Sequence, residues 1–432
     1  MHAEAVSQEE AENLLVPLAR FPRVALAVSG GPDSLALMHL AAKCRDRLGG
    51  PALFVLTVDH GLRAGSRAEA EMVGRAAKAH DVSHAILTWK HGAVDARVQA
   101  RARAARYDLM AAYCTAHDIQ ALVTAHHLDD QAETFLMRLK RGSGLDGLTA
   151  IPQEGSWAGL TLLRPLLDIP KVRLAATAKD AGLSYVTDPS NDDARFERGR
   201  MRGAVDALAE LGLTPEAIAL SARRLRRARA ALEAATDDLL SRHAETSAAG
   251  YAVIDLAALL SAPAEIALRA LARLIVTVGG ATEPSRLAKL EALLAALKAD
   301  PDKAHTLGRC RITPRHGRLL FFREMRKAGL PELTLRPGER MLWDNRFRIE
   351  LGAGESAPIT VRALGEEGLK VLKEREALPP LPWPAARALP GCWRGGRLLC
   401  LPDFDQKPLQ PAPSSRHEVG LDCRATFLRG AL

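Results

Sequence analysis

The chain has 432 residues, of which 47% are apolar and 25% are charged. These proportions are ordinary for a globular protein and exclude a disordered chain, a collagen-like repeat and a coiled coil. Because a single hydrophobic core stops growing at about 250–300 residues, the length predicts two or three domains. Lys and Arg outnumber Asp and Glu by 59 to 51, which gives a net charge of +8, so the grouping of the arginines matters more than their total.

Membrane and export signals are absent from the sequence. No stretch approaches the roughly 20 apolar residues of a membrane-spanning helix, and the acidic N-terminus lacks the basic and apolar regions of a secretory signal. The six cysteines include no C-x-x-C pair and no zinc or iron–sulfur spacing. We therefore expect a cytoplasmic protein with reduced thiols, without membrane association and without an obligatory protein partner.

The first half of the chain alternates short apolar runs with longer amphipathic ones. The short runs, predicted as strands, are residues 23–29, 52–59, 85–89 and 121–125, and the long runs, predicted as helices, are 34–48, 66–80 and 94–117. Such alternation indicates an α/β fold in which right-handed crossovers build a parallel sheet with helices on both faces. Ligands of these sheets bind beyond the carboxyl ends of the strands, so the residues that follow each strand are the candidates for function.

The pattern changes after Asn191. Residues 195–297 have helical periodicity, and beyond Asp300 the chain carries short β-like runs at 306–313, 318–324, 346–351 and 359–363. We predict a nucleotide-binding α/β domain at residues 1–213, a helical domain at 214–330 and a small β-rich domain at 331–432.

The first predicted strand leads into Ser29-Gly30-Gly31-Pro32-Asp33-Ser34 and then into a helix. Two glycines allow the backbone to curl so that amides point inward, and the helix adds its unpaired N–H groups and the positive end of its dipole. This arrangement predicts an anion cradle of phosphate size, although it is neither a Walker nor a Rossmann motif. The alternative is a tight turn in which Asp33 or Ser34 only caps the helix.

The hexapeptide resembles the PP-loop of the ATP pyrophosphatases, enzymes that cleave ATP between the α- and β-phosphates to adenylate a carbonyl. Further segments resemble one branch of that group, the tRNA(Ile)-lysidine synthetases, in the family's order and spacing. These segments are D-H-G-L-R at 59–63, A-H-H-L-D-D-Q-A-E-T at 125–134, R-L-K-R-G-S-G at 138–144, R-P-L-L at 164–167 and D-P-S-N at 188–191.

The resemblance implies a ligase that uses ATP and Mg²⁺ to join free L-lysine to C2 of the wobble cytidine, position 34, of the isoleucine tRNA with a CAU anticodon. Pyrophosphate and AMP are released, and codon reading changes from AUG to AUA. ATP would be bound by the residues of the loop and of the second strand end: Ser29, Gly30, Gly31, Pro32, Asp33, Ser34, Asp59 and His60. The alternative is another PP-loop enzyme such as a tRNA 2-thiolase, which needs a C-x-x-C pair or a reactive cysteine near these loops.

Two imidazoles and three carboxylates follow the fourth predicted strand: His126, His127, Asp129, Asp130 and Glu133. On a helix, Asp130 and Glu133 are neighbours at i and i+3 and can face one ligand. The residue types suit either a divalent metal or a cationic substrate, and any one of them alone would also suit a helix N-terminus. The resemblance favours Asp130 and Glu133 as the lysine site. Asp33 and Asp130 are then catalytic, and Asp33 and Asp129 are candidate Mg²⁺ ligands.

The reaction requires a base, because the lysine amine must lose a proton before it attacks. A carboxylate or either of the two histidines could serve, and the sequence leaves this choice open.

Arginines are grouped in the middle of the chain. Arg198 and Arg202 occupy a segment that resembles the family pattern R-N-x-[IL]-R, with Gly199 in place of the asparagine, and the resemblance implies that they reach the active site. The later domains resemble tRNA-binding domains appended in the family. Candidate tRNA contacts are Arg138, Arg141, Arg223, Arg224 and Arg227. The alternative for the last three is a solvated basic helix face.

Overall fold

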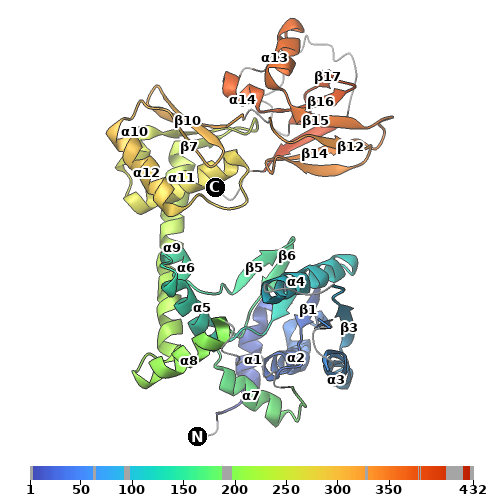
Figure 1. Ribbon diagram of the computed structural model, residues 1–432. Coiled ribbons are helices and arrows are strands. Elements are labelled where there is room, and N and C mark those ends of the chain that lie inside the picture. The colour runs from blue at the N-terminus through green and yellow to red at the C-terminus, as the bar shows by residue number, and fades with distance from the viewer. Residues whose placement is uncertain are drawn as a thin grey trace. The chain divides into compact units, whose positions relative to one another are not determined.

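The computed structural model describes residues 3–61, 65–91, 98–186, 197–325, 329–377, 379, 381–404 and 422–428, without the side chains of residues 48, 98–100, 197, 198, 202 and 206. The chain divides into two compact units, Met1–Arg229 and Ala230–Leu432 (Figure 1). Helix α9 (Pro215–His243) runs from the first unit into the second. The predicted domain boundaries near residues 213 and 330 stay predictions.

A six-stranded sheet forms the centre of the first unit, in the order β3-β2-β1-β4-β6-β5. Strands β1 to β4 and β6 pair in parallel, and β5 is antiparallel to β6. The predicted α/β fold is therefore confirmed, with an edge hairpin added. The strands are β1 (Arg23–Ala27), β2 (Ala52–Asp59), β3 (Ser83–Thr88), β4 (Ala121–Thr124), β5 (Glu154–Trp157) and β6 (Leu160–Leu163).

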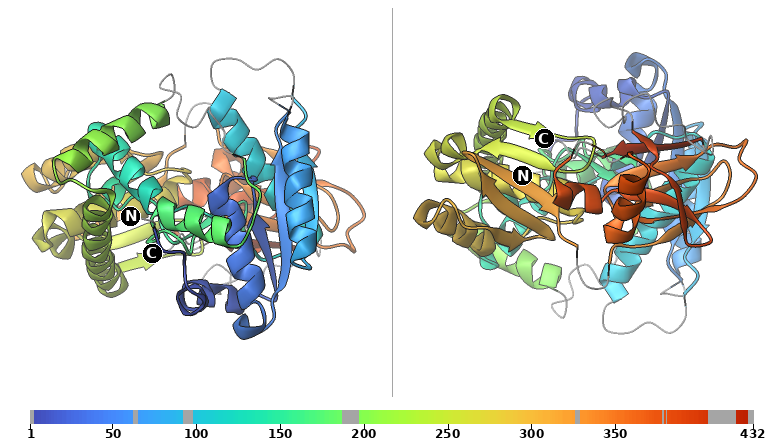
Figure 2. Two further views of the ribbon diagram at one scale, coloured as in Figure 1. Left: turned by 90° about the horizontal axis from the view of Figure 1, so that it is seen from below. Right: turned by 90° about the horizontal axis from the view of Figure 1, so that it is seen from above.

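Helices lie on both faces of this sheet (Figures 1 and 2). One hydrophobic core joins the sheet to α1 (Gln8–Leu15), α2 (Pro32–Cys44), α3 (Ser66–Ala79) and α7 (Lys171–Asp180), and a second core joins it to α4 (Val98–Ala116). Burial from both sides explains why the central strands are continuous apolar runs. The remaining helices are the short 3-10 turns η1 (Val16–Arg20) and η2 (Asp46–Leu48), and α5 (Leu128–Lys140), α6 (Leu145–Leu148) and α8 (Glu197–Glu210).

The strand order places two loops side by side. Strands β1, β2 and β3 follow one another in one direction, whereas β4 pairs with the other edge of β1, where Val24 lies opposite Ala121. Such a reversal opens a crevice at the carboxyl ends of the two strands, where ligands bind in open α/β sheets. The loops after β1 and β4 carry the two main predicted motifs.

The second unit begins with a five-stranded antiparallel sheet in the order β7-β8-β11-β10-β9. The region predicted as helical therefore carries a sheet as well as its helices. The run at 306–313, predicted as one strand, forms two, because the chain turns at Gly308 and Arg309 with φ of +57° and +66°. The elements are β7 (Ala244–Thr246), β8 (Ala252–Asp255), α10 (Leu256–Ser261), α11 (Ala264–Gly279), α12 (Leu287–Ala299), β9 (His305–Leu307), β10 (Cys310–Arg315) and β11 (Arg318–Arg323).

Two four-stranded sheets complete the second unit, in the orders β12-β15-β16-β17 and β13-β14-β19-β18, and they share one core around the buried Trp343 and Trp393. This confirms the predicted β-rich C-terminal region. The elements are β12 (Leu333–Leu335), β13 (Arg340–Trp343), β14 (Phe347–Leu351), β15 (Ile359–Ala363), α13 (Gly365–Glu374), α14 (Trp383–Arg387), β16 (Pro390–Arg394), β17 (Arg397–Cys400), β18 (Asp403–Phe404) and β19 (Cys423–Phe427).

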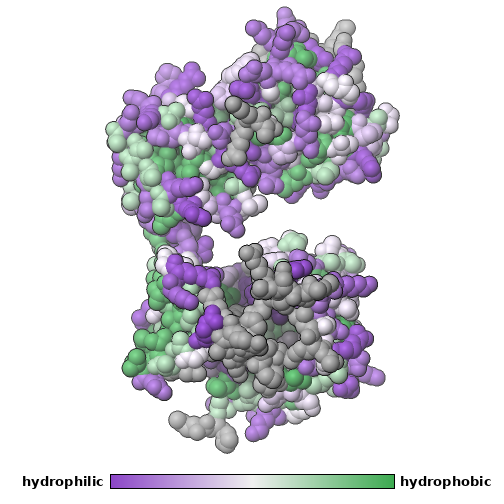
Figure 3. Space-filling model, viewed as in Figure 1, coloured by the Kyte–Doolittle hydropathy of each residue, from purple (hydrophilic) through white to green (hydrophobic). Residues whose placement is uncertain are grey.

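Hydrophilic side chains cover most of the visible face of the second unit, with small hydrophobic areas between them (Figure 3). Among the described helices, none has both the length and the apolarity that crossing a membrane requires.

Candidate active site

The loop after β1 leads directly into α2, and its glycine and serine residues fix its shape. Gly30 has φ of +87°, a conformation that favours glycine, and Gly31 precedes the first helical residue, Pro32. The Ser29 amide donates to Ser34 Oγ at 3.1 Å, and Ser34 Oγ donates to the Gly31 carbonyl at 3.0 Å. The serine hydroxyl thus ties the loop together, while the N–H groups of the first helical turn have no partner within the helix.

Space around the two glycines differs. A Cβ on Gly30 would lie 3.4 Å from Met72 Cε and 3.5 Å from Val73 Cγ2 of α3, so this side of the loop is packed. Among the described residues, a Cβ on Gly31 would meet only Ser29 Oγ within 4 Å, at 3.8 Å. The open side of the loop is therefore the side of Gly31, where a phosphate can approach the backbone. This geometry fits the predicted cradle.

His127 connects the loop after β1 with the loop after β4. Its Nε2 lies 3.6 Å from Asp33 Oδ2 and 3.6 Å from Asp130 Oδ2, and its Nδ1 lies 3.6 Å from Asp129 Oδ2. The residue is only 4% exposed. His127 also begins α5: its backbone N–H donates to Asp130 Oδ2 at 3.1 Å, and its imidazole faces the Asp130 amide at 3.4 Å. Three predicted carboxylates thus surround one imidazole.

The charges of this cluster perturb one another. Burial raises the pKa of Asp33, and the positive charges of His127 and Lys171 only partly oppose it. Burial acts to lower the pKa of His127, but the hydrogen bond with Asp129 and the charges of Asp130 and Asp33 outweigh it, so this pKa is raised. Burial likewise acts to raise the pKa of Asp129, yet the bonds with His127 and with the Lys171 amide hold it below its usual value.

Asp129 has a second partner on α7. Its Oδ2 accepts the Lys171 backbone N–H at 2.9 Å, at the start of that helix. A carboxylate at this position is stabilised by the helix dipole. Asp129 therefore helps to hold α7 beside the site, and its predicted role as a Mg²⁺ ligand stays a prediction.

Asp59 and His60 lie at the end of β2. Asp59 Oδ1 accepts bonds from Ser66 Oγ at 2.6 Å and from the Gly61 amide at 3.0 Å, and the Ser66 bond above all lowers its pKa. The His60 carbonyl faces His91 Nε2 at 2.9 Å. Asp59 thus links the end of β2 to the first residue of α3, and the predicted ATP contacts of both residues stay predictions.

The lysine-binding candidates lie on the first turns of α5. Glu133 is 2% exposed, so its carboxylate is held inside the protein, and Asp130 is half-buried beside His127. His126, just before the helix, contacts Thr124 Oγ1 through Nδ1 at 2.7 Å. Burial lowers the pKa of His126 to about 3, so this imidazole is neutral at physiological pH.

A group of cations near His126 was missed at the level of sequence. The charges of Arg164, Arg103 and Arg106 lower the pKa of His126, while the charge of Asp130 raises it. Arg103 and Arg106 of α4 lie over the ring of Tyr107, at 5.3 and 5.6 Å, and Arg164 donates to the Pro152 carbonyl at 2.9 Å. The i, i+3 spacing of the first two on a predicted helix is the signal that could have found them.

The five arginines at residues 223–229 of α9 divide into two groups. Arg223, Arg226 and Arg229 are spaced by three and bind the first unit: Arg223 contacts Asp168 at 3.2 Å, Arg226 donates to the Thr149 and Ile151 carbonyls at 3.3 Å, and Arg229 pairs with Asp146 at 2.7 Å. The other two, Arg224 and Arg227, are exposed. The predicted basic face is therefore partly a packing surface.

The other predicted arginines have different surroundings. Arg138 donates through one nitrogen to the Gly147 carbonyl at 2.7 Å and to the Ala150 carbonyl at 3.0 Å, so it supports the turn around α6. Arg141 is exposed. The side chains of Arg198 and Arg202, and the segment 188–191, lie outside the described residues.

The donor set suits a metal that is shared with a phosphate. Asp33 Oδ1 is buried and has no hydrogen-bond partner among the described residues. Among all the residues that the structure describes, no group of three or more His, Cys, Asp or Glu side chains is arranged to hold a metal. Mg²⁺ commonly binds one or two carboxylates together with substrate phosphates and water, and Asp33 beside the loop fits that mode.

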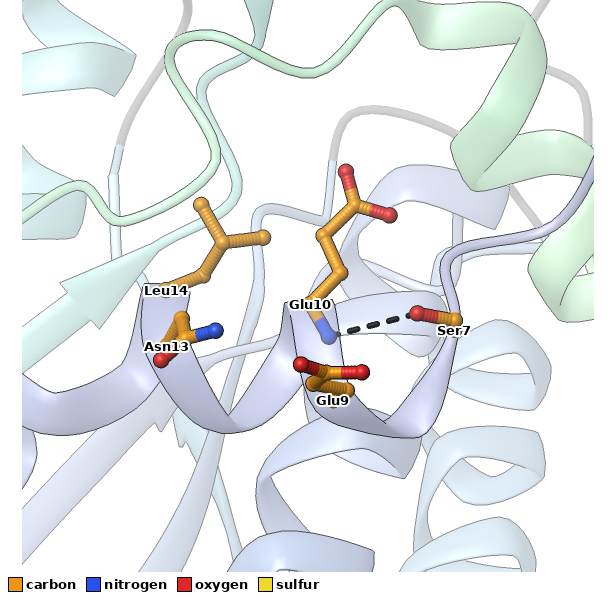
Figure 4. Close-up of a pocket in the computed structure, with 5 residues that line it drawn as sticks. All are labelled: Ser7, Glu9, Glu10, Asn13 and Leu14. Carbon is orange, nitrogen blue, oxygen red and sulfur yellow. Dashed lines mark hydrogen bonds between the residues drawn. The ribbon is translucent and has the colours of Figure 1, made fainter.

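A pocket on α1 has a different character. It is lined by Ser7, Glu9, Glu10, Asn13 and Leu14 (Figure 4). Ser7 Oγ accepts the Glu10 amide at 3.2 Å, and the Glu10 carboxylate pairs with Arg173 of α7 at 2.7 Å. These groups cap α1 and hold it against α7, and none of them is a predicted site residue.

Comparison with known proteins identifies the family of the first unit. The family description of the PP-loop domain matches residues 3–208. The fold and the site thus define a nucleotide-binding domain of the PP-loop type.

Relatives extend the match beyond that domain. A tRNA(Ile)-lysidine synthase of Rhodopseudomonas palustris is 46% identical over 299 residues, covering 68% of this chain and 85% of that protein. One of Ruegeria pomeroyi is 35% identical over 380 residues, covering 88% of each. A solved structure, the U34-tRNA thiolase NcsA of Methanococcus maripaludis, is 18% identical with a TM-score of 0.43, covering 50% of this chain and 78% of that one. The chain belongs to the tRNA(Ile)-lysidine synthase family, and it is an ATP-dependent ligase of tRNA modification.

Proposed function

We propose that the chain joins free L-lysine to C2 of the wobble cytidine, position 34, of the isoleucine tRNA with a CAU anticodon. The observation that carries the proposal is the position of His127, which brings Asp33 of the phosphate-binding loop within 3.6 Å of the same imidazole as Asp129 and Asp130. An ATP site and an acidic site for a cationic nucleophile are then adjacent. We place the reaction in the cytoplasm, since all six cysteines are free and buried.

The first step is adenylation of the base. The C2 carbonyl oxygen of the cytidine attacks the α-phosphorus of ATP, and the bond to the β-phosphate breaks with release of pyrophosphate. The loop at Gly30 and Gly31 would hold the departing phosphates through backbone N–H groups, which stabilise the developing negative charge. Asp33 would hold Mg²⁺, which supplies further charge neutralisation when bound.

The second step transfers lysine. The ε-amine attacks C2, AMP leaves with the oxygen, and lysidine remains. Before the attack, the amine must pass its proton to a base. Burial lowers the pKa of His126 to about 3, whereas the carboxylates around His127 raise the pKa of that imidazole. We assign the proton to Asp130, because it is also the proposed partner of the lysine ammonium group together with Glu133.

Lysine also carries an α-carboxylate, and we assign that group to Arg103 and Arg106. Their charges lower the pKa of His126 whereas the charge of Asp130 raises it, so groups of both signs lie within electrostatic range of one imidazole. A zwitterionic substrate needs both, because each of its charges loses water on binding.

The experiment is incorporation of radiolabelled lysine into the CAU-anticodon tRNA by the purified protein. We expect steady-state conversion of ATP to AMP and pyrophosphate only when both lysine and this tRNA are present. Formation of ADP, or equal turnover when sulfide replaces lysine, would contradict the proposal, and the second result would indicate a 2-thiolase.

A further inference from the structure

A cavity of about 490 Å³ lies in the second unit, away from every residue assigned above. Its floor is the outer face of the sheet, where Arg311 of β10 lies opposite Thr306 of β9 and Phe322 of β11. Its wall is α14, which packs against β11 and begins with Trp383 (Figure 1). The volume is within the range of small-molecule sites.

Aromatic and cationic groups line this cavity together. Trp383 is 51% exposed, an unusual state for the largest side chain, and Arg311 is also exposed. Two of the lining residues carry a buried nitrogen atom, His305 Nε2 and Arg387 Nε, that has no hydrogen-bond partner among the described residues. Buried polar atoms are normally paired, so these two side chains have hydrogen-bonding capacity left for a ligand.

The lining contains three arginines and one glutamate, and one of the arginines is neutralised inside the protein. Arg323 donates two bonds to Asp344, at 2.9 and 2.8 Å, so its charge is neutralised inside the protein. Arg387 lies 3.3 Å from Glu366, and Arg311 has no ion pair among the described residues. Glu324 adds one carboxylate to the rim of the cavity.

We propose that this cavity binds one unpaired nucleotide of the tRNA, its base stacked on Trp383 and its phosphate held by Arg311 and Arg387. A flat ring, an anion and polar edges are the three features that the lining complements. Glu324 can accept a hydrogen bond from an exocyclic amino group, so adenine, cytosine or guanine fits better than uracil. The identity of the RNA rests on the proposed function, whereas the stacking site rests on the cavity.

The test measures the dissociation constant for tRNA without ATP or lysine. Base stacking on an aromatic side chain contributes about 1–3 kcal/mol, so Trp383→Ala should weaken binding about 5- to 150-fold. Trp383→Phe should restore most of the affinity. Leu342→Ala is the matched control, because Leu342 of β13 is 50% exposed in the same unit and does not line the cavity.

Two further arms identify the contacts. Arg311→Gln should lower the salt dependence of binding by about one phosphate contact. Loss of the Trp383 effect on a tRNA trimmed of its unpaired 3′ nucleotides would identify that end as the source of the base, and persistence of the effect would identify a loop nucleotide.

The proposal fails if Trp383→Ala binds tRNA as tightly as the unmodified chain, or if Leu342→Ala loses as much affinity. Because the assay contains no ATP or lysine, such a failure leaves the ligase activity untested by it. Conversely, a chain that binds tRNA through Trp383 but incorporates no lysine would refute only the proposed function.

Discussion

The two units build their candidate sites in different ways. In the first, the main groups come from two continuous segments, 29–34 and 126–133, each directly after a parallel strand. In the second, the cavity collects side chains from 304 to 387, through antiparallel register and one short helix. Parallel strands bring their carboxyl ends to one edge, so short motifs suffice there. An antiparallel face has no such edge, and its site depends on pairings that no local motif reveals.

The largest effect is expected from a substitution of Asp33, in the candidate site of the first unit. If the site of the first unit depends on its short motifs, Asp33→Asn should reduce pyrophosphate release by about 10²–10³-fold or more, because a group that stabilises transferring phosphates is lost. Single-turnover assays with bound tRNA would measure the effect. Asp180→Asn, at the exposed end of α7, is the control and should retain full activity. An Asp33→Asn variant that releases pyrophosphate as fast as the unmodified chain would contradict the proposed chemistry.

A second prediction concerns lysine recognition by Arg103, which lies outside the two motifs at residues 29–34 and 126–133. Arg103→Met should raise the KM for lysine about 10- to 100-fold, since hydrogen bonds between charged groups contribute about 1.5–3 kcal/mol. Cadaverine, which is lysine without its carboxylate, should be used equally by the variant and the unmodified enzyme. A variant that loses ATP affinity instead would place Arg103 at the phosphates.

Asp130→Asn is the complementary variant, because asparagine can still accept the His127 amide and cap α5. We expect a similar loss of lysine use, with ATP affinity changed less than about twofold. Unchanged lysine dependence together with weakened ATP binding would contradict the assigned role.

The interactions between His127 and the surrounding carboxylates should make the local stability depend on pH. Its raised pKa means that charged His127 stabilises the fold below its unfolded pKa of about 6.5, and that this contribution is lost as pH rises through the folded pKa. The pKa of Asp129 is lowered, so its ionised carboxylate stabilises the fold above about pH 3.9, and this contribution is lost as pH falls through the pKa of the folded state. The pair is therefore strongest between about pH 4 and 6.5.

The variant His127→Asn keeps a helix-capping residue but removes the titrating ring. We expect it to lose about 1–3 kcal/mol relative to the unmodified chain near pH 5.5, and less near pH 8.5. Hydrogen exchange of the α5 amides, compared between the two proteins at each pH, measures the difference. An equal loss at both pH values would show that the imidazole charge is not involved.

The sequence predicted the parts of the fold that regular patterns encode. The first four strands and their helices were found because each strand contains a short, mainly apolar run bounded by turn residues. The edge hairpin β5–β6 was missed, because it turns at Ala158 and Gly159 with φ of +48° and +82°, and alanine seldom occupies such a position. The same kind of turn at Gly308 and Arg309 divided a run that reads as one strand.

The candidate site was predictable where residue types and strand ends coincide. Asp33, Asp129 and Asp130 follow strands and meet at His127, which the sequence analysis treated only as one candidate base beside His126 and the carboxylates. Arg103 lies in the middle of a helix, and its approach to this region depends on how α4 crosses the sheet. The cavity at Trp383 depends on long-range packing, so the sequence contains no signal for it.

The arginines of α9 also show that the sequence does not reveal which side chains are used in packing. Their substitution gives the smallest predicted effect. Five of them read as one basic cluster, yet three bind the first unit and two are exposed. Replacing Arg224 and Arg227 by glutamine should lower the slope of log affinity for tRNA against log salt by about 0.9 per phosphate contact, a loss of only a few-fold in affinity at physiological salt. Arg226→Gln, the control, should instead destabilise the first unit by about 1 kcal/mol with an unchanged slope, because its partners are carbonyl groups. Equal salt slopes in all three proteins would mean that this face of α9 is only solvated, and that the positive charge of the chain meets the RNA elsewhere.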